Sequence, residues 1–204
     1  MKTSIYIAID GNIGAGKSSL VRLLKYILKA RVLEEPVEEN PFLEAFYKDP
    51  EKFAFHNQLY FLVARYKQLI SITQLSFFYN YYLTDYLFYR DRIFAELTLS
   101  KHELNLYYSL YNIVEKEVPI PDYVVYLKAD IDTLVKRIKL RNRSFEQNIS
   151  KDYLLKLNDY YNEFYTKYDK SPLLILDVSN IDFVNNENDQ EKVLKEVLSF
   201  IEYE

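Results

Sequence analysis

One stretch near the N-terminus combines residue types and spacing that suit phosphate chemistry. It reads Gly11-Asn12-Ile13-Gly14-Ala15-Gly16-Lys17-Ser18 and matches the pattern GxxxxGK[ST], the phosphate-binding P-loop. The chain has three glycines in 204 residues, and all three lie in these eight positions. Because glycine lacks a Cβ atom, the loop can turn its N–H groups inward around an anion. A tight turn that merely matches the pattern is the alternative, and the scarcity of glycine elsewhere argues against it.

The motif predicts a site for a nucleoside triphosphate, with ATP and Mg²⁺ as the expected cofactors. Lys17 is expected to reach the β- and γ-phosphates, and Ser18 to bind Mg²⁺. The following helix adds the positive end of its dipole. The predicted triphosphate-binding residues are Gly11, Asn12, Ile13, Gly14, Ala15, Gly16, Lys17, Ser18 and Ser19.

Two carboxylates follow predicted strands. Val32-Leu33-Glu34-Glu35 predicts a short strand that Pro36 stops, which places Glu35 at the edge of a parallel sheet where ligands bind. Taken alone, the glutamates of this segment are more typical of a solvated acidic loop. Phe77 to Leu83 predicts another strand, and Asp85 at its exit is a candidate for the Mg²⁺ shell. A helix N-cap is the competing interpretation of Asp85.

A long helix predicted from Asp49-Pro50 to about Thr73 carries Gln58 and Arg65 on one side, because seven residues make two turns. On local evidence they are a surface glutamine and a snorkelling arginine. The apolar face predicted for this helix consists of Leu59, Leu62, Val63, Tyr66 and Ile70.

Three arginines lie within seven residues at the end of another predicted helix. Arg137 and Arg141 are one turn apart on a shared face, and Arg143 follows. A solvated basic helix end is one interpretation. In a triphosphate enzyme they fit a lid, at about residues 137–149, that supplies positive charge to the transferred phosphoryl group.

Composition limits the function classes. The net charge of −4 and the pI of about 5.4 argue against a nucleic-acid partner. The chain has no cysteine and no 18-residue apolar run, and Met1-Lys2 leads directly into a core-like strand. We therefore expect a soluble, cytoplasmic protein with no membrane partner.

The elements that must position these residues alternate between strand and helix. Apolar runs at 5–9, 32–35, 77–83, 123–127 and 173–176 predict five strands, with amphipathic helices between them. This pattern predicts an α/β fold of the P-loop NTPase type: one three-layer domain over residues 1–204, with a parallel five-stranded sheet flanked by helices and an arginine-rich lid. We expect the polar segment Asn185 to Gln190 to be a mobile loop.

The sequence resembles the deoxyribonucleoside kinase family over nearly its whole length. The distinguishing stretches are Glu35-Pro36-Val37-Glu38, Phe46-Tyr47-Lys48-Asp49-Pro50 leading to Gln58 and Arg65, and Arg137-Ile138-Lys139-Leu140-Arg141-Asn142-Arg143. Within the family it is most similar to the bacterial deoxyguanosine and deoxyadenosine kinases. Thr84-Asp85-Tyr86, Tyr89 and Arg92-Ile93-Phe94-Ala95-Glu96 favour the deoxyguanosine kinase branch.

The resemblance implies ATP-dependent phosphorylation of the 5′-hydroxyl of a purine deoxynucleoside in nucleotide salvage, by a homodimer that associates through the long helices. Glu35 is the implied general base for that hydroxyl. The implied nucleoside contacts are Tyr47 and Glu146 to the 3′-hydroxyl, and Gln58, Arg65 and Asp91 to the base edge. Asp85 and Ser18 are the implied Mg²⁺ ligands, and Arg137, Arg141 and Arg143 the lid.

Two positions depart from the family pattern. The usual acidic-Arg-Ser/Thr signature is Asp85-Tyr86-Leu87 here, so its arginine is missing, and Arg90 or Arg92 is a candidate to replace it. The usual Arg-Gly-Arg of the lid is Arg141-Asn142-Arg143; asparagine tolerates left-handed backbone better than most residues.

Two other functions stay open on the sequence alone. A nucleoside monophosphate kinase shares the fold, although it needs cations around the acceptor phosphate where this chain has glutamates. A nucleotide-binding regulatory subunit of a heterodimeric kinase is the second, because of Tyr86.

Overall fold

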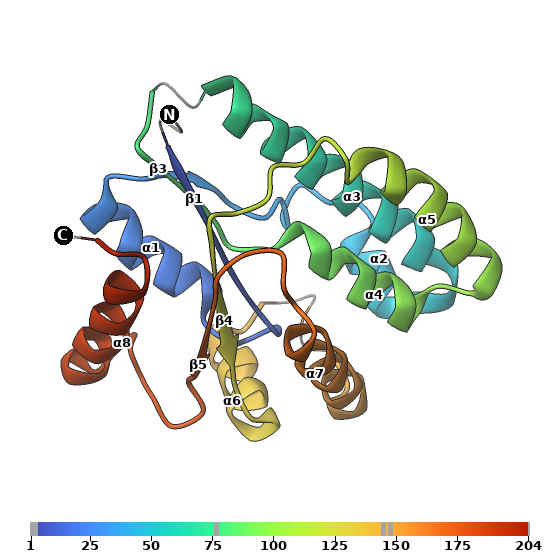
Figure 1. Cartoon of the computed structure of the whole chain (residues 1–204). Coiled ribbons are helices and arrows are strands. Elements are labelled where there is room, and N and C mark those ends of the chain that lie inside the picture. The colour runs from blue at the N-terminus through green and yellow to red at the C-terminus, as the bar shows by residue number, and fades with distance from the viewer. Residues whose placement is uncertain (1–3, 76–77, 144–145, 147–148, 204) are drawn as a thin grey trace.

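The structure is a computed structural model that describes residues 4–75, 78–143, 146 and 149–203 (Figure 1). Its strands are β1 (Ile5–Gly11), β2 (Arg31–Leu33), β3 (Tyr81–Thr84), β4 (Tyr123–Lys128) and β5 (Leu173–Asp177). Its α-helices are α1 (Lys17–Leu28), α2 (Leu43–Lys48), α3 (Pro50–Leu75), α4 (Asp91–Thr98), α5 (Lys101–Val114), α6 (Ile131–Arg141), α7 (Lys151–Thr166) and α8 (Glu187–Phe200). A 3₁₀ turn, η1 (Phe88–Arg90), precedes α4.

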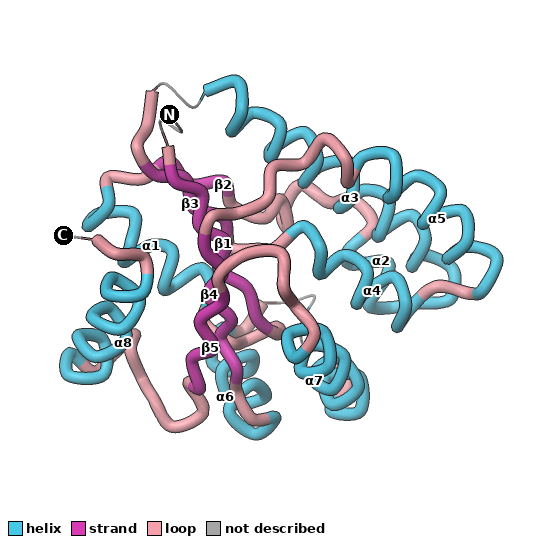
Figure 2. The backbone as a smooth tube through the Cα atoms, viewed as in Figure 1, coloured by secondary structure: helices cyan, strands magenta, loops and turns pink. Residues whose placement is uncertain are grey.

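The five strands form one parallel sheet in the order β2-β3-β1-β4-β5, which confirms the predicted α/β fold. Helices cover both faces (Figure 2). Apolar residues of α1 and α8 pack on one face, and those of α3, α4, α5 and α7 on the other. The central strand β1 is buried along nearly its whole length, so the loop that leaves it is anchored in the core.

Two glycines let the loop pass close to neighbouring groups. Gly11 has φ 153°, and a Cβ atom there would lie 2.6 Å from the carbonyl oxygen of Leu127 in β4. Gly16 begins α1 in the left-handed region with φ 103°, where its Cβ would meet the ring of Phe183 at 2.7 Å. Larger residues at these positions would be strained by both the backbone angle and the contact.

Three predicted boundaries are wrong. The strand predicted from Phe77 begins at Tyr81, where pairing with Ile5 starts; Phe78 and Tyr79 are exposed, and Phe77 lies outside the described residues. The predicted strand at 32–35 ends earlier, at Leu33. The predicted loop at 185–190 contains the first turn of α8, because the Asn186 side chain accepts a hydrogen bond from the N–H of Asp189 and caps that helix.

The buried face of α3 differs from the predicted apolar face. Val63 is 47% exposed, whereas Gln58 and Arg65 are buried together with Leu62 and Leu69. The polar pair therefore points into the protein and is not at its surface. Within the described part of the chain, neither α3 nor any other helix is long and apolar enough to cross a membrane.

We predict that Gly11→Ala lowers the free energy of unfolding by about 2–4 kcal/mol, because the new methyl group meets a backbone carbonyl of a central strand. Urea denaturation measures this change. Gly16→Ala is the matched control with a smaller expected loss, since its contact is the ring of the Phe183 side chain and not a backbone carbonyl. An equal or smaller loss for Gly11→Ala would contradict the prediction.

Candidate active site

Lys17 lies where the loop after β1 enters α1, at the carboxyl ends of the strands. Its ammonium group donates hydrogen bonds to the carbonyl oxygens of Gly11 (2.8 Å) and Asn12 (3.1 Å). Burial, together with the positive charge of Arg90, lowers the pKa of Lys17 to about 8. An anion such as a phosphate bound beside this ammonium group would stabilise its charged form, which the neighbouring cation disfavours.

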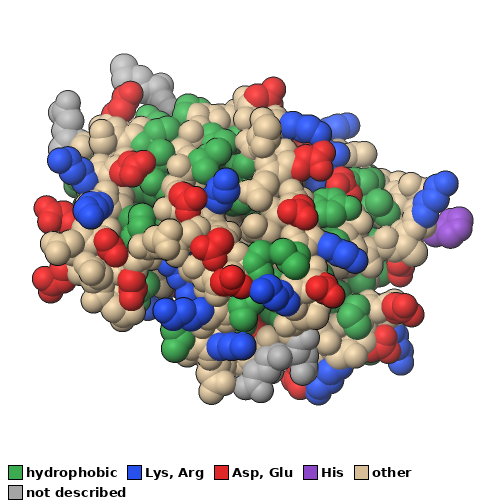
Figure 3. Space-filling view, turned by 90° about the horizontal axis from the view of Figure 1, so that it is seen from below, with side chains coloured by type: hydrophobic (Ala, Val, Ile, Leu, Met, Phe, Trp, Pro, Cys, Tyr) green, Lys and Arg blue, Asp and Glu red, His purple; other side chains and the backbone are tan. Residues whose placement is uncertain are grey.

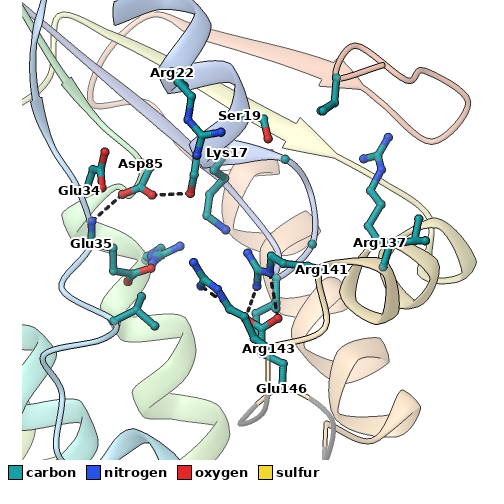
Figure 4. A pocket seen from close by; sticks show the side chains of 18 of the residues that line it. Lys17, Ser19, Arg22, Glu34, Glu35, Asp85, Arg137, Arg141, Arg143 and Glu146 are labelled. Carbon is teal, nitrogen blue, oxygen red and sulfur yellow. Dashed lines mark hydrogen bonds and ion pairs between the residues drawn. The ribbon is translucent and has the colours of Figure 1, made fainter. Parts of the chain in front are cut away.

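Asp85 joins three elements of the site. One carboxylate oxygen accepts a hydrogen bond from the backbone N–H of Glu35 (2.7 Å), and the other accepts one from the Ser18 hydroxyl (2.8 Å; Figure 4). Leu33 and Thr84 are register partners in β2 and β3, so both carboxylates leave the sheet at the same edge. The alternative role of Asp85 as a helix N-cap is wrong, since the residue preceding η1 is Leu87.

Glu35 is held between two arginines. Arg65 from α3 and Arg90 from η1 both form ion pairs and hydrogen bonds with Glu35 Oε1. Burial by itself would raise the pKa of the Glu35 carboxyl, but the positive charges of Arg90 and Arg65 outweigh burial and hold it well below its usual range. Glu35 is therefore ionised throughout the physiological pH range.

Each arginine has a second carboxylate partner. Arg90 pairs with Asp10 at 3.0 Å, and Arg65 pairs with Asp91. Both aspartates are buried, and a buried charge is stable only when it is paired and hydrogen-bonded. The result is a row of alternating charges, Asp10–Arg90–Glu35–Arg65–Asp91, which we call the charge row.

The predicted lid arginines do not act as one group in this structure. Arg141 Nε donates to Glu146 Oε2 at 3.0 Å, and Arg143 lies 3.8 Å from the same carboxylate. The guanidinium of Arg137 lies apart from them (Figure 4) and donates to the carbonyl oxygens of Ala15, Val178 and Ile181 at 2.6–3.2 Å. Although Arg137 and Arg141 start on one helix face, their guanidinium groups diverge because each finds different acceptors.

Positions 144, 145, 147 and 148 of the predicted lid lie outside the described residues. Glu146 is described and is buried, with 4% of its surface exposed. The structure therefore does not describe the predicted lid as a whole, but it does describe Glu146, the carboxylate that Arg141 contacts.

One cavity of about 1220 Å³ connects these groups, which exceeds the volume typical for a single small ligand. The site residues that line it include Lys17, Ser18, Glu35, Tyr47, Gln58, Arg65, Asp85, Arg90, Arg137, Arg141, Arg143 and Glu146. Asp91 is not among the described residues that line the cavity, but it forms an ion pair with Arg65, which does line it. Figure 3 looks onto this side of the molecule, where acidic and basic side chains are interspersed.

Comparisons with known proteins agree with this geometry. A family model described as deoxynucleoside kinase matches residues 7–202. The chain belongs to the deoxynucleoside kinase family. A deoxyguanosine kinase from Bacillus subtilis is 35% identical over 206 residues, which cover 98% of this chain and 100% of the relative. A deoxyadenosine/deoxycytidine kinase from the same species is 32% identical over 208 residues, covering 98% and 94%.

Solved structures of family members support the same assignment. A structure of the deoxyadenosine kinase from M. mycoides, described with products dCMP and a flexible dCDP bound, has a TM-score of 0.84 and 34% identity, covering 96% of this chain and 100% of that one. A structure of the same kinase with bound dATP has a TM-score of 0.81 at 34% identity, covering 95% and 98%. The protein is thus a deoxynucleoside kinase.

The structure separates the two arginines proposed to replace the missing signature arginine of this kinase. Arg90 is 2% exposed and contacts Glu35, whereas Arg92 is exposed and lies over the ring of Tyr108, 5.4 Å from its centre.

Sequence reasoning missed Asp10 as a site residue. A carboxylate inside the buried apolar run of β1, directly before the first P-loop glycine, was the available signal.

We predict that Glu35→Gln destabilises the protein by about 2–4 kcal/mol at pH 7, because two buried arginines lose a negative partner. Since the folded-state pKa of Glu35 lies below its ordinary value of 4.5, this stabilisation is complete above pH 4.5 and is lost as the pH falls further. Urea denaturation of both proteins at pH 7 and pH 3.5 should show the difference shrink at the lower pH. Glu38→Gln, at an exposed neighbour, serves as the control; a difference independent of pH would contradict the prediction.

Proposed function

We propose that this kinase transfers the γ-phosphoryl group of ATP to the 5′-hydroxyl of a purine deoxynucleoside, deoxyguanosine first and deoxyadenosine next, in cytoplasmic nucleotide salvage. The observation that carries the proposal is an ionised Glu35 that lines one cavity with the P-loop lysine. A negative carboxylate there suits a neutral hydroxyl acceptor and repels an acceptor that already carries a phosphate.

In the proposed reaction the 5′-oxygen forms a bond to the γ-phosphorus while the bond from that phosphorus to the β,γ-bridging oxygen breaks, so ADP leaves with that electron pair. Glu35 orients the hydroxyl and accepts its proton. With a loose transition state, positioning and charge stabilisation contribute most of the rate. Lys17 binds the β- and γ-phosphates, and Arg137, Arg141 and Arg143 are the proposed source of lid charge.

Ser18 and Asp85 are the proposed Mg²⁺ ligands. A hydroxyl and a carboxylate oxygen 2.8 Å apart beside the P-loop are hard oxygen donors of the kind Mg²⁺ prefers. Within the described residues, no group of three or more His, Cys, Asp or Glu side chains forms a site for a metal alone, which agrees with an ion held jointly by protein and phosphates. When bound, Mg²⁺ would neutralise charge on the phosphates.

The proposed base contacts favour guanine. Gln58 and Arg65 line the cavity, and the buried Nε–H of Arg65 has no acceptor among the described residues. Guanine presents two acceptors, O6 and N7, on the edge where adenine presents one acceptor and one donor. Asp91 holds Arg65 in place, and Tyr47, beside Glu146, is proposed to hold the 3′-hydroxyl with that carboxylate.

A competition assay with the four deoxynucleosides and γ-labelled ATP tests the function. We expect deoxyguanosine to be phosphorylated best, deoxyadenosine next, and the two pyrimidines at least roughly tenfold less efficiently, because a site that hydrogen-bonds one base rejects a base without the matching groups. Removing Mg²⁺ should stop transfer. Glu35→Gln should lower turnover by about 10²- to 10⁴-fold while nucleoside still binds.

Two outcomes of this assay would contradict the proposal. Preferred transfer to deoxyguanosine monophosphate would exclude the nucleoside as acceptor. Binding of deoxynucleoside and ATP with no turnover by the purified protein would instead favour a regulatory subunit.

We also propose a homodimer formed through the long helices. Leu106, Leu110 and Ile113 repeat along one side of α5 and are 41–65% exposed. This row is an apolar surface of the kind that helix pairs bury. Sedimentation equilibrium should give a dimer for the unmodified protein and a monomer for Leu110→Glu, with Leu155→Glu on α7 as an equally exposed control that stays dimeric. A monomeric unmodified protein would contradict it.

A further inference from the structure

The residue at the signature position carries no charge into the site. Tyr86 is fully buried, and its hydroxyl donates to Gln68 Oε1 at 2.7 Å, on the side of α3. It is not among the residues that line the active-site cavity. Whatever positive charge the acceptor end of the site receives from this segment must therefore come from another residue.

Arg90 lies four residues further on and extends back into the cavity. Its Nη1 donates to Asp10 at 3.0 Å and to the Tyr161 hydroxyl at 3.3 Å, and its Nη2 reaches Glu35. It lines the cavity together with Lys17, whose pKa it helps to lower, so its charge acts at the place where phosphate is expected. The Arg90 Nε–H has no acceptor among the described residues.

We propose that Arg90, anchored by Asp10, is a positioning residue that holds Glu35 in place and supplies positive charge at the acceptor end of the site, in the role vacated at Tyr86. This inference rests on the proposed function of Glu35.

Asp10 explains why a buried arginine can act from this position. A buried guanidinium without a partner is strongly unfavourable, and Glu35 lies at the cavity wall where substrate competes for it. Asp10 is completely buried in the central strand, and its other oxygen accepts a hydrogen bond from Tyr165 at 2.6 Å. Arg90 therefore stays in place when its contact with Glu35 changes.

The charge that Arg90 presents to the substrate changes during the proposed reaction. Before transfer, the Arg90 guanidinium is shared by two carboxylates, Asp10 and Glu35. When Glu35 takes the proton of the hydroxyl, its negative charge disappears and Arg90 keeps only Asp10 as a counter-ion. More of its positive charge then acts on the phosphoryl oxygens at the moment they are transferred.

Arg90 is one of several groups whose charge affects Glu35. The others are Arg65, Lys17, Asp85, Tyr47, Tyr86 and Tyr161. Those besides Glu35 that face Arg90 are Asp10, Lys17, Tyr161 and Tyr165. A test must therefore change Arg90 and leave this set intact.

The test compares Arg90→Gln with Arg92→Gln, an exposed arginine two residues away. We expect Arg90→Gln to lower kcat by about 100-fold, the loss typical of one charge-stabilising donor, with KM for deoxyguanosine changed less than about threefold. Arg90→Lys should recover part of kcat, and Arg92→Gln should keep the unmodified values.

Removing Arg90 alone takes away the ion-pair partner of the buried Asp10, so a loss of folding in the single variant must be separated from a loss of catalysis. The double variant Asp10→Asn with Arg90→Gln removes both charges together and should have the same reduced kcat as Arg90→Gln. Full kcat in either folded variant, or an equal loss in Arg92→Gln, would overturn the inference.

A measurement without turnover separates this inference from the proposed function. A crystal structure of the Arg90→Gln variant should show the Glu35 side chain displaced from the position that it occupies between Arg65 and Arg90 in the unmodified protein. Failure of the unmodified enzyme to phosphorylate any deoxynucleoside would refute the proposed function only. An unchanged Glu35 position in Arg90→Gln would refute the inference only.

Discussion

A single, partly buried carboxylate between two guanidinium groups organises this kinase. Glu35 is held by Arg65 and Arg90, and each arginine is held from behind by an aspartate. Removing each of these charges from water is unfavourable unless the charge is paired with an opposite one. The elements that carry the paired charges are therefore held at fixed positions relative to one another. The charge row therefore ties the central strand β1, the segment after β2, the long helix α3 and the start of α4 around one cavity.

The same arrangement reconciles two demands on Glu35 in its proposed role as proton acceptor. A proton acceptor must be ionised at neutral pH, whereas burial in the site favours the neutral acid. The flanking arginines outweigh burial and keep the carboxylate charged, at the cost of making it a weak base. In a reaction whose transition state is loose, orientation of the hydroxyl matters more than basicity, so this compromise suits phosphoryl transfer.

Arg90, and not the residue at the signature position, brings positive charge next to Glu35 in this chain. Tyr86 fills the space beside α3 and bonds Gln68, and Arg90 enters the cavity from the 3₁₀ turn that follows. Asp10 and Tyr165 form its anchor from β1 and α7. What matters for such a site is the charge next to the substrate, and an arginine side chain can supply that charge from more than one position in the chain.

The sequence by itself determined the P-loop and the five parallel strands and placed Glu35 and Asp85 after strands, because glycine spacing and hydrophobic periodicity are local signals. Gln58 and Arg65 became candidates only through the resemblance to the deoxyribonucleoside kinase family, since their local pattern favoured a surface position. Only the tertiary structure chose between Arg90 and Arg92, brought Asp10 into the site and sent Arg137 away from Arg141. Long side chains from elements far apart in the chain decide such contacts by competing for buried partners, and no local pattern records which partner each one finds.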